Sequence, residues 1–337
     1  MQNELIQWYK NNKRDLPWRK TNNPYHIWIS EIMLQQTTVE AVIPYYIRFI
    51  QRFPNINTLA SSTLEEVYKY WEGLGYYRRA KHIYETASII HNKYNDVFPD
   101  NYDEILSLKG IGSYTAGAIS SIAFLKEKPA VDGNVLRIIS RTHFILDNIA
   151  ENKTQKAITS IVEELIKNHD PSSFNQGLMD LGATICRPKN PKCELCPIQH
   201  DCQAYHQNQQ NMLPINIKKV KNTSISYITG IISYQNQYFL IKNPKGLLEN
   251  LYGLKQYECQ DPYEFIKLFE KEYNCKLEPK AFIKDFKHVF SHRTWIMHVY
   301  HFESKELLDS FYTKKEISLL PISTAHLKIL NYYSKEN

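Results

Sequence analysis

Two carboxylates and a pair of glycines in this chain have types and spacing suited to chemistry. Gly110 and Gly112 flank one isoleucine, in a turn where glycines let successive backbone N–H groups face an anion. Asp132 follows, directly before a Gly-Asn-Val sequence at the expected start of a helix, where the helix dipole favours an ionised carboxylate. The alternatives are a plain helix connection and a plain N-cap. Together the two features predict a phosphate clamp followed by a functional aspartate.

The second carboxylate is Glu31, and its neighbours make it unusual. At helical spacing it shares a face with Ile27 and Leu34, so a carboxylate lies on an otherwise apolar side of the expected helix. A buried, unpaired carboxylate has a raised pKa, which suits a general acid. The competing interpretation is a partly exposed glutamate bonded to neighbouring backbone.

Two nearby stretches are suited to contact with DNA. Residues 35–38, Gln-Gln-Thr-Thr, form a polar cluster that no hydrophobic core needs. Amides there are suited to fill the gap left in a DNA stack when a base is flipped out. Tyr76 and Tyr77 precede two arginines, which indicates an aromatic wedge with cations to hold the phosphates. Packing of the tyrosine pair in a core is the alternative.

Four cysteines lie close enough in sequence to ligate one metal centre: Cys186, Cys193, Cys196 and Cys202. The chain begins without an export leader, so metal ligation is favoured over disulfides. Structural zinc sites usually contain two Cys-x-x-Cys pairs, and only Cys193 and Cys196 form one. An iron–sulfur cluster with four cysteine ligands therefore fits this spacing better, with zinc as the alternative.

The elements that position these residues must form more than one domain. The chain has 337 residues, more than a single hydrophobic core usually holds. Its 43% hydrophobic and 23% charged content is typical of a globular protein and excludes a disordered one. A net charge of +6 permits a polyanionic partner without requiring one. With neither a leader nor a membrane-spanning apolar run, we expect a soluble, cytoplasmic protein.

Two regions of different pattern follow each other along the chain. Residues 1–205 read as helix after helix, which predicts an all-α domain that contains the cysteine loop of residues 186–202. Residues 206–222 are rich in Gln, Asn and Lys and predict an exposed linker. Residues 223–337 mix strands with helices, which predicts an α+β domain. The polar turn of residues 288–292 between two expected strands indicates, by itself, either a metal site or no function.

Taken together, these motifs resemble the helix-hairpin-helix DNA glycosylase superfamily and, within it, the adenine DNA glycosylases of the MutY type. The resemblance covers nearly the whole chain. Its motifs are SEIMLQQT around Glu31, GIGSYTAG with Tyr114 where endonuclease III has a nucleophilic lysine, VDGNV around Asp132, and the C-terminal residues 246–254 and 290–292. It implies a helix-hairpin-helix at about residues 106–125, a [4Fe–4S] cluster on the four cysteines, and a Nudix-like C-terminal domain that recognises 8-oxoguanine.

Two departures from the family are confined to the C-terminal domain. Residues 255–257 read Lys-Gln-Tyr where the family more often has Trp-Glu-Phe, a difference of local packing. Residues 263–273 lack the acid spacing of a working Nudix hydrolase, so pyrophosphate hydrolysis is not expected.

The resemblance also implies a role for each site residue. Glu31 would protonate the adenine and Asp132 would stabilise the oxocarbenium ion, while Tyr114 and Asn134 position these carboxylates. The pocket for the flipped adenine would be lined by Trp18, Arg19, Leu34 and Gln176. Further contacts to DNA are expected from Gln35, Gln36, Thr37, Tyr76, Gly110, Gly112, Phe290, Ser291 and His292. The expected partner is duplex DNA with adenine opposite 8-oxoguanine or guanine, bound by a monomer.

Two other functions fit the sequence less well. A bifunctional glycosylase/lyase related to endonuclease III would need a lysine amine to form a Schiff base, and the hairpin offers Tyr114 instead. A non-catalytic DNA-binding protein with a redox-sensing cluster would leave Glu31 on its apolar face unexplained.

Overall fold

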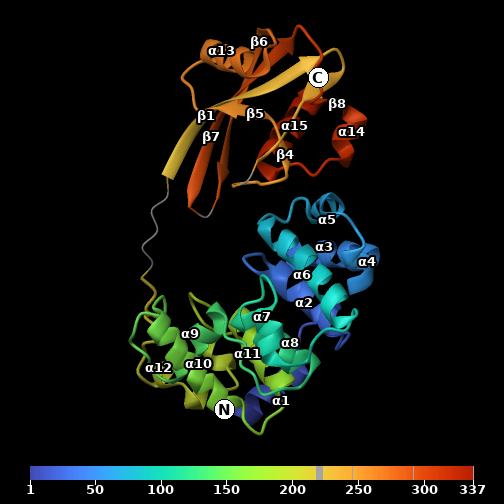
Figure 1. Ribbon diagram of the computed structural model, residues 1–337. Helices are drawn as coiled ribbons and strands as arrows, with labels where there is room; N and C mark the ends of the chain where they lie inside the picture. The colour runs from blue at the N-terminus through green and yellow to red at the C-terminus, as the bar shows by residue number, and fades with distance from the viewer. Residues whose placement is uncertain (218–222, 245, 291, 337) are drawn as a thin grey trace. The chain divides into compact units, whose positions relative to one another are not determined.

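The computed structural model describes residues 1–217, 223–244, 246–290 and 292–336, and the chain divides into two compact units (Figure 1). The first unit contains Met1–Ser62 and Arg78–Lys218, and the second contains Thr63–Tyr77 and Lys219–Asn337. Residues 63–77, which the sequence pattern assigns to the helical region, therefore group with the C-terminal strands. Within the described residues, no helix combines the length and the apolarity that crossing a bilayer requires.

The first unit is all-α, as the sequence predicts. Its α-helices are α1 (Gln2–Asn12), α2 (Pro24–Leu34), α3 (Val39–Arg52), α4 (Ile56–Ala60), α6 (Arg78–Tyr94), α7 (Tyr102–Ser107), α8 (Ser113–Ala123), α9 (Gly133–Thr142), α10 (Asn152–Ile166), α11 (Pro171–Thr184) and α12 (Gln203–His206). Short 3₁₀ turns are η1 (Pro17–Arg19), η2 (Cys193–Leu195) and η3 (Gln199–Asp201).

The core of this unit fixes the helices that carry the predicted site. Val135, Ile138 and Ile139 lie on one face of α9 and pack in one cluster with Leu178 and Leu181 of α11. Burial of such side chains contributes about 1.5–3 kcal/mol each, so α9 and α11 are firmly held against each other. The N-terminus of α9, where Asp132 lies, is thereby fixed relative to α11.

One glycine allows the hairpin between α7 and α8 to form, and a second lets the following segment pack against α8. Gly110 has φ of +77°, and a Cβ at this position would lie 2.5 Å from the His82 side chain. Gly117 lies in α8, where a Cβ would be 1.9 Å from the carbonyl oxygen of Pro129. The segment that leads to Asp132 therefore runs directly over α8, which a larger residue would prevent.

The second unit is α+β, as predicted. It contains α5 (Leu64–Trp71), β1 (Thr223–Tyr234), β2 (Gln237–Phe239), β3 (Ile241–Lys242), β4 (Tyr252–Gly253), β5 (Lys255–Tyr257), α13 (Pro262–Tyr273), β6 (Leu277–Val289), β7 (Arg293–Ser304), β8 (Phe311–Thr313), α14 (Lys314–Leu319) and α15 (Thr324–Glu336). The main sheet has six strands in the order β6-β7-β1-β2-β8, with β5 paired to β1, and β3 and β4 form a separate pair. Strands β1 and β7 are parallel.

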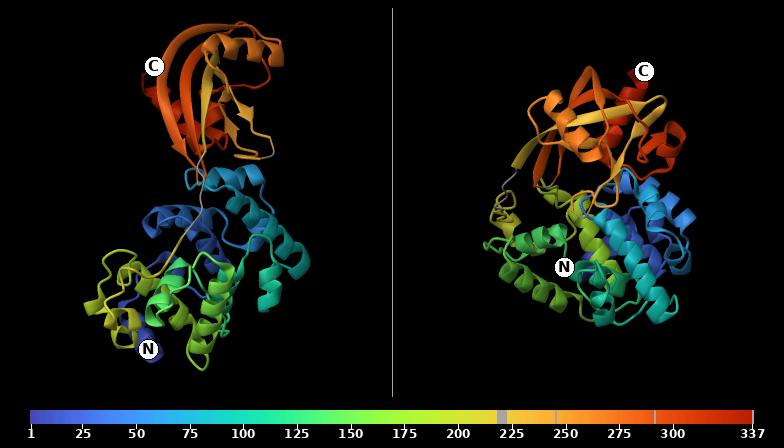
Figure 2. Two further views of the ribbon diagram at one scale, coloured as in Figure 1. Left: turned by 90° about the vertical axis from the view of Figure 1, so that its left-hand side faces the viewer. Right: turned by 45° about the horizontal axis from the view of Figure 1, so that its top comes forward.

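The main sheet is covered on both faces. Phe265 and Phe269 of α13 pack with Phe302 on one face, whereas Ile329 of α15 packs with Met297 on the other. The long antiparallel strands β6 and β7 lie side by side, as the two views of Figure 2 show, and the turn between them contains residues 290–292. This arrangement places the predicted recognition turn at one end of the sheet.

Candidate active site

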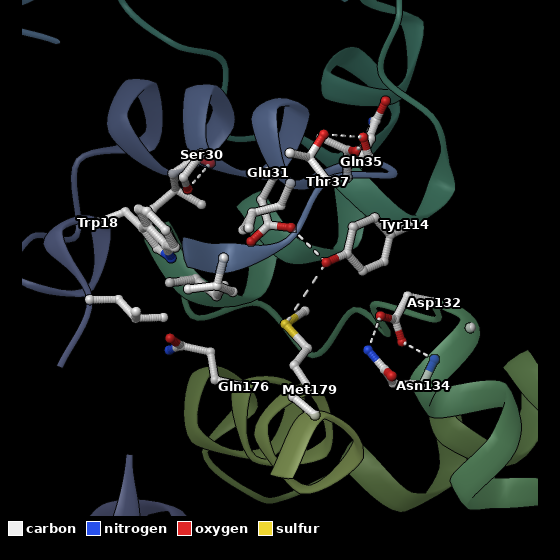
Figure 3. A pocket seen from close by; sticks show the side chains of 18 of the residues that line it. Trp18, Ser30, Glu31, Gln35, Thr37, Tyr114, Asp132, Asn134, Gln176 and Met179 are labelled. Atoms are coloured by element: carbon white, nitrogen blue, oxygen red, sulfur yellow. Dashed lines mark hydrogen bonds between the residues drawn. The ribbon is translucent and has the colours of Figure 1, made fainter. Parts of the chain in front are cut away.

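The first unit contains a cavity of about 660 Å³ that both predicted carboxylates line. Glu31 comes from α2, Tyr114 from α8 and Asp132 from the start of α9, while Gln176 and Met179 come from α11 (Figure 3). Residues far apart in sequence therefore line one cavity.

Glu31 is only 5% exposed and has a side-chain partner. Its Oε2 accepts a hydrogen bond from the Tyr114 hydroxyl at 2.6 Å. Burial raises the pKa of Glu31 to about 7, and the nearby Asp132 adds to this, although the hydrogen bond and Arg19 act in the opposite direction. The partly exposed, backbone-bonded glutamate that the sequence also allowed is therefore not what the structure contains.

Tyr114 lies between the carboxylate and α11. Burial raises the pKa of its hydroxyl well above the ordinary value, and Glu31 and Asp132 raise it further, so the hydroxyl keeps its proton. Besides Glu31, this hydroxyl contacts the Met179 Sδ at 3.9 Å. Tyr114 is therefore a fixed donor to Glu31.

Asp132 is the N-cap of α9 and also faces the cavity. Its Oδ1 accepts from the backbone N–H groups of Asn134 and Val135, both at 2.8 Å, and its Oδ2 accepts from the Asn134 Nδ2 at 2.8 Å. Burial raises the pKa of Asp132, and these donors oppose the rise. The N-cap and functional interpretations are therefore compatible.

Asn134 is in turn held by Arg137, a residue that the sequence pattern did not single out. The Arg137 guanidinium donates to the Asn134 Oδ1 at 2.9 Å, to the Gly182 carbonyl at 2.8 Å and to the Cys186 carbonyl at 2.7 Å. One side chain thus links the amide beside Asp132 to the first cysteine of the metal-binding loop.

The predicted wall of the pocket is present, and a buried aspartate that the sequence pattern did not reveal holds one of its residues. Trp18, Leu34 and Gln176 line the cavity. Arg19 lines it too, with its guanidinium donating to Asp180 at 2.5 and 2.8 Å. Burial alone would raise the pKa of Asp180, but its arginine partners lower it below the ordinary value. The sequence feature that marks Asp180 is a charged residue inside the apolar Leu-Met-Asp-Leu run of α11.

The predicted polar cluster follows directly after α2, at the cavity. Gln35, Gln36 and Thr37 all line it. The Gln35 amide donates to the Thr115 hydroxyl at 3.4 Å, whereas Gln36 is exposed and has φ of +58°, an uncommon value for a residue other than glycine. Of these three cavity-lining residues, Gln36 is therefore the exposed one.

The two adjacent tyrosines have different environments. Tyr76 is 47% exposed with φ of +50°, whereas Tyr77 is 7% exposed and packs edge-on against Tyr68 at 5.6 Å between ring centroids. Arg78 is exposed, but Arg79 is buried. Of the predicted wedge, only Tyr76 and Arg78 are accessible, and Tyr77 is a packing residue.

In the second unit, the predicted recognition turn is partly described. Phe290 is half-buried, with its ring 4.9 Å from Trp295 and 4.6 Å from His288 in edge-on contacts. His292 is exposed, and Ser291 lies outside the described residues.

The four predicted cysteine ligands line one small cavity in the first unit, together with Arg141. The Arg141 guanidinium donates to the Cys186 Sγ at 3.2 Å. Burial and the neighbouring cysteines raise the pKa of the Cys196 thiol to about 12. The four cysteines line one cavity, and the guanidinium beside it offsets the negative charge of thiolate ligands, so these residues fit a metal cluster.

Comparison with known proteins identifies two sequence families in the chain. Residues 29–164 match the profile of the HhH-GPD superfamily base excision DNA repair protein, and residues 186–202 match the iron-sulfur binding domain of endonuclease III. The second match spans the four cysteines and no more.

Curated relatives extend over most of the chain. Adenine DNA glycosylase of Buchnera aphidicola subsp. Schizaphis graminum is 40% identical over 295 residues, which cover 86% of this chain and 84% of the relative. The enzyme of the same name from Buchnera aphidicola subsp. Baizongia pistaciae is 41% identical over 86% of this chain and 82% of the relative. Adenine DNA glycosylase of Homo sapiens is 38% identical over a region that covers 62% of this chain and 40% of the relative.

Two solved structures each match about three fifths of the chain. A thermostable thymine-DNA glycosylase has 32% identity and a TM-score of 0.54, covering 61% of this chain and 94% of its own. A non-covalent endonuclease III–DNA complex has 23% identity and a TM-score of 0.53, covering 62% of this chain and 94% of its own, and this second likeness concerns the fold alone.

Proposed function

Because this chain belongs to the adenine DNA glycosylases, within the HhH-GPD superfamily of base excision DNA repair proteins, we propose that it flips adenine out of A:8-oxoguanine and A:G mispairs and hydrolyses its glycosidic bond, with Glu31 as general acid. The observation that carries the proposal is the buried Glu31 carboxyl, hydrogen-bonded to Tyr114 in the same cavity as Asp132. The partner is duplex DNA, bound by one copy of the chain.

Glu31 supplies the proton that makes adenine a leaving group. A neutral purine leaves poorly unless a ring nitrogen is protonated as the glycosidic bond stretches. A carboxyl group with a pKa of about 7 is protonated in a large fraction of molecules at neutral pH, unlike an ordinary glutamate. Tyr114 donates to one carboxyl oxygen and so orients Glu31.

Asp132 meets the positive charge that develops on the sugar. An ionised carboxylate beside an oxocarbenium ion stabilises it electrostatically or traps it covalently, as paired carboxylates do in retaining glycosidases. The three donors around Asp132 favour its ionised form, whereas among the described residues Tyr114 is the one side chain that donates to Glu31. Two carboxylates in different environments thereby take opposite roles.

The remaining predicted residues bind the substrate. Trp18, Leu34 and Gln176 enclose the flipped adenine, and Gln36 enters the space that the base leaves in the stack. Backbone N–H groups of the hairpin turn at Gly110 and Gly112, ahead of α8, face a phosphate of the same strand. Tyr76 inserts beside the opposite base.

Lysine chemistry is not part of this site. None of the described residues that line the cavity is a lysine, so no amine is available there for a Schiff base. We therefore expect base loss without strand cleavage. The test is an oligonucleotide duplex with one adenine opposite 8-oxoguanine: release without nicking supports the proposal, nicking indicates a lyase, and binding alone indicates a non-catalytic protein.

The opposite base is read by the turn of residues 290–292 in the second unit. 8-Oxoguanine differs from guanine by an oxo group at C8 and a proton on N7, which a hydroxyl and an imidazole can distinguish. Replacing both Ser291 and His292 by alanine should therefore leave excision from A:G largely intact and abolish the preference for A:8-oxoguanine, at about 1–3 kcal/mol for each lost hydrogen bond.

Single-turnover rates on the two mispairs measure this preference. Val289→Ala is the matched control, because Val289 is an exposed neighbour of the turn without a polar group. A double variant that kept the full preference would assign the reading of the opposite base to residues outside this turn.

The chain carries a [4Fe–4S] cluster, and we propose Cys186, Cys193, Cys196 and Cys202 as its ligands. The cluster closes the loop that Arg137 and Arg141 tie to α9. The purified protein is expected to be yellow-brown. Cys193→Ser should lower both the colour and the soluble yield, because binding of the cluster is coupled to the folding of such a loop. Visible absorption with iron and sulfide analysis measures this. Cys259→Ser, in the second unit, should keep the colour, and a colourless protein with stoichiometric zinc would refute the cluster.

A further inference from the structure

Arg79 is a buried cation at the start of α6, with 8% of its surface exposed. An arginine beside the exposed Arg78 in a DNA-binding protein would be expected to face phosphates. Its guanidinium instead donates to the carbonyl groups of Ile32 at 2.9 Å and Met33 at 2.8 Å. It also donates to the Gln35 carbonyl at 2.5 Å and the Thr37 hydroxyl at 3.3 Å.

These acceptors belong to the end of α2 and to the polar cluster after it. The last carbonyl groups of a helix have no partner in the next turn, and a cation at this end is favourable. Glu31 lies one turn before the end of the same helix. Arg79 therefore completes the hydrogen bonding of the helix end that carries the proposed acid.

The chain leaves α2 in a conformation that needs support. Gln36 has the left-handed φ of +58° and is exposed, between Gln35 and Thr37, which both bond to Arg79. A residue other than glycine holds such a conformation only when its surroundings fix it. Arg79 bonds to the residue on each side of Gln36 and is thus placed to fix it.

We propose that Arg79 is a positioning residue, which presets residues 35–37 in the conformation that fills the DNA stack when adenine leaves it. The inference rests on the proposed function, in which Gln36 enters the stack. Its consequence is selective: loss of the guanidinium fork lowers the rate at which a paired adenine is extruded, and affects an adenine without a paired partner much less.

The test compares Arg79→Lys with the wild-type protein on two duplexes, one with an A:G mispair and one with adenine opposite an abasic site. Lysine keeps the charge, but its single ammonium nitrogen cannot replace the planar fork, in which one nitrogen bonds to the carbonyl groups and the other to the Thr37 hydroxyl. Under single turnover with saturating protein, we expect the A:G rate to fall about 10- to 100-fold relative to wild type. The rate on the unpaired adenine should fall much less.

Arg78→Lys and Arg78→Ala are the matched controls. They change an exposed arginine one position earlier, so the alanine variant should weaken binding and lower the salt dependence of affinity by about one phosphate contact. The ratio between the two substrates should not change in either control. Arg79→Lys should keep the wild-type salt dependence, which separates positioning from phosphate contact.

Three results would overturn the inference: equal losses on both duplexes, a reduced salt dependence in Arg79→Lys, or no loss. If Arg79→Lys does not fold, as judged by thermal melting and cluster absorbance, Thr37→Val decides instead. It removes one acceptor at nearly constant shape, and it should show the same selective loss in smaller measure. If the wild-type protein releases adenine from neither duplex, the proposed function fails, and this outcome is distinct from a failure of the Arg79 assignment.

Discussion

Glu31→Gln is expected to abolish adenine release and to leave the fold and DNA binding intact. Glutamine has nearly the same shape, and its carbonyl oxygen can still accept the Tyr114 hydrogen bond. It cannot donate a carboxylic acid proton, and general acid catalysis is worth about 10²- to 10⁴-fold. Single-turnover excision and a binding titration on the same A:8-oxoguanine duplex measure the two properties separately.

The pH dependence of the wild-type rate identifies the acid. The proton donor is the neutral carboxyl group, so the rate should fall as pH rises through about 7, the raised pKa of Glu31. Any residual excision rate of Glu31→Gln should not decrease as pH rises through 7. Residual activity with the wild-type pH dependence would assign the acid to another residue.

The same substitution should make the protein more stable at alkaline pH. The pKa of Glu31 rises from 4.5 to about 7 on folding, so the native state holds the proton more tightly than the unfolded chain. Ionisation of Glu31 therefore destabilises the folded state. The free energy of unfolding should fall by about 3 kcal/mol in total as pH rises from 4.5 to 7. The melting temperature of Glu31→Gln should exceed that of wild type at pH 8, and the difference should shrink towards pH 4.5.

Local sequence was sufficient to predict both carboxylates, because each departs from the pattern of its own helix. Glu31 interrupts an apolar face, and Asp132 precedes a helix start. Asp180 shows the same departure in α11, yet its meaning depends on Arg14 and Arg19, about 160 residues away in sequence. Long-range partners of this kind have no signature within a sequence window.

Exposure was the property that the sequence predicted least well. Tyr76 and Tyr77 have the same side chain, and Arg78 and Arg79 do too, but one member of each pair is buried. Adjacent residues of a helix or turn point in different directions, and the tertiary packing decides which of them meets the core. A wedge of two tyrosines and two arginines was therefore predicted where the structure leaves one of each accessible.

The role proposed for the turn of residues 290–292 rests on family resemblance alone. Its own composition allowed a metal site or no function, and nothing in its local pattern indicates a base. Two long paired strands, β6 and β7, place it at a sheet end, and Trp295 supports Phe290 from below. These are features of tertiary structure, which a short sequence window does not reveal.

Asp132 caps α9 and has a second, catalytic role in the proposed function, and the two can be separated because asparagine is as good an N-cap as aspartate. In Asp132→Asn, the side-chain oxygen can still accept from the N–H groups of Asn134 and Val135. The new amide nitrogen would face the Asn134 Nδ2 donor, which now bonds to the second carboxylate oxygen. We expect this repulsion to cost about 1–2 kcal/mol of stability, which leaves the protein folded.

Adenine release by Asp132→Asn is nevertheless expected to fall about 10²- to 10³-fold or more, because a neutral amide replaces the carboxylate that faces the oxocarbenium ion. The matched control is Asp170→Asn. Asp170 caps α11 in the same way, accepting from the N–H groups of Ser172 and Ser173, but it is exposed and does not line the cavity. Both variants should melt within a few degrees of wild type and bind the A:8-oxoguanine duplex, while only Asp132→Asn loses the single-turnover rate. If Asp132→Asn kept that rate, the Asp132 carboxylate would be an N-cap and nothing more.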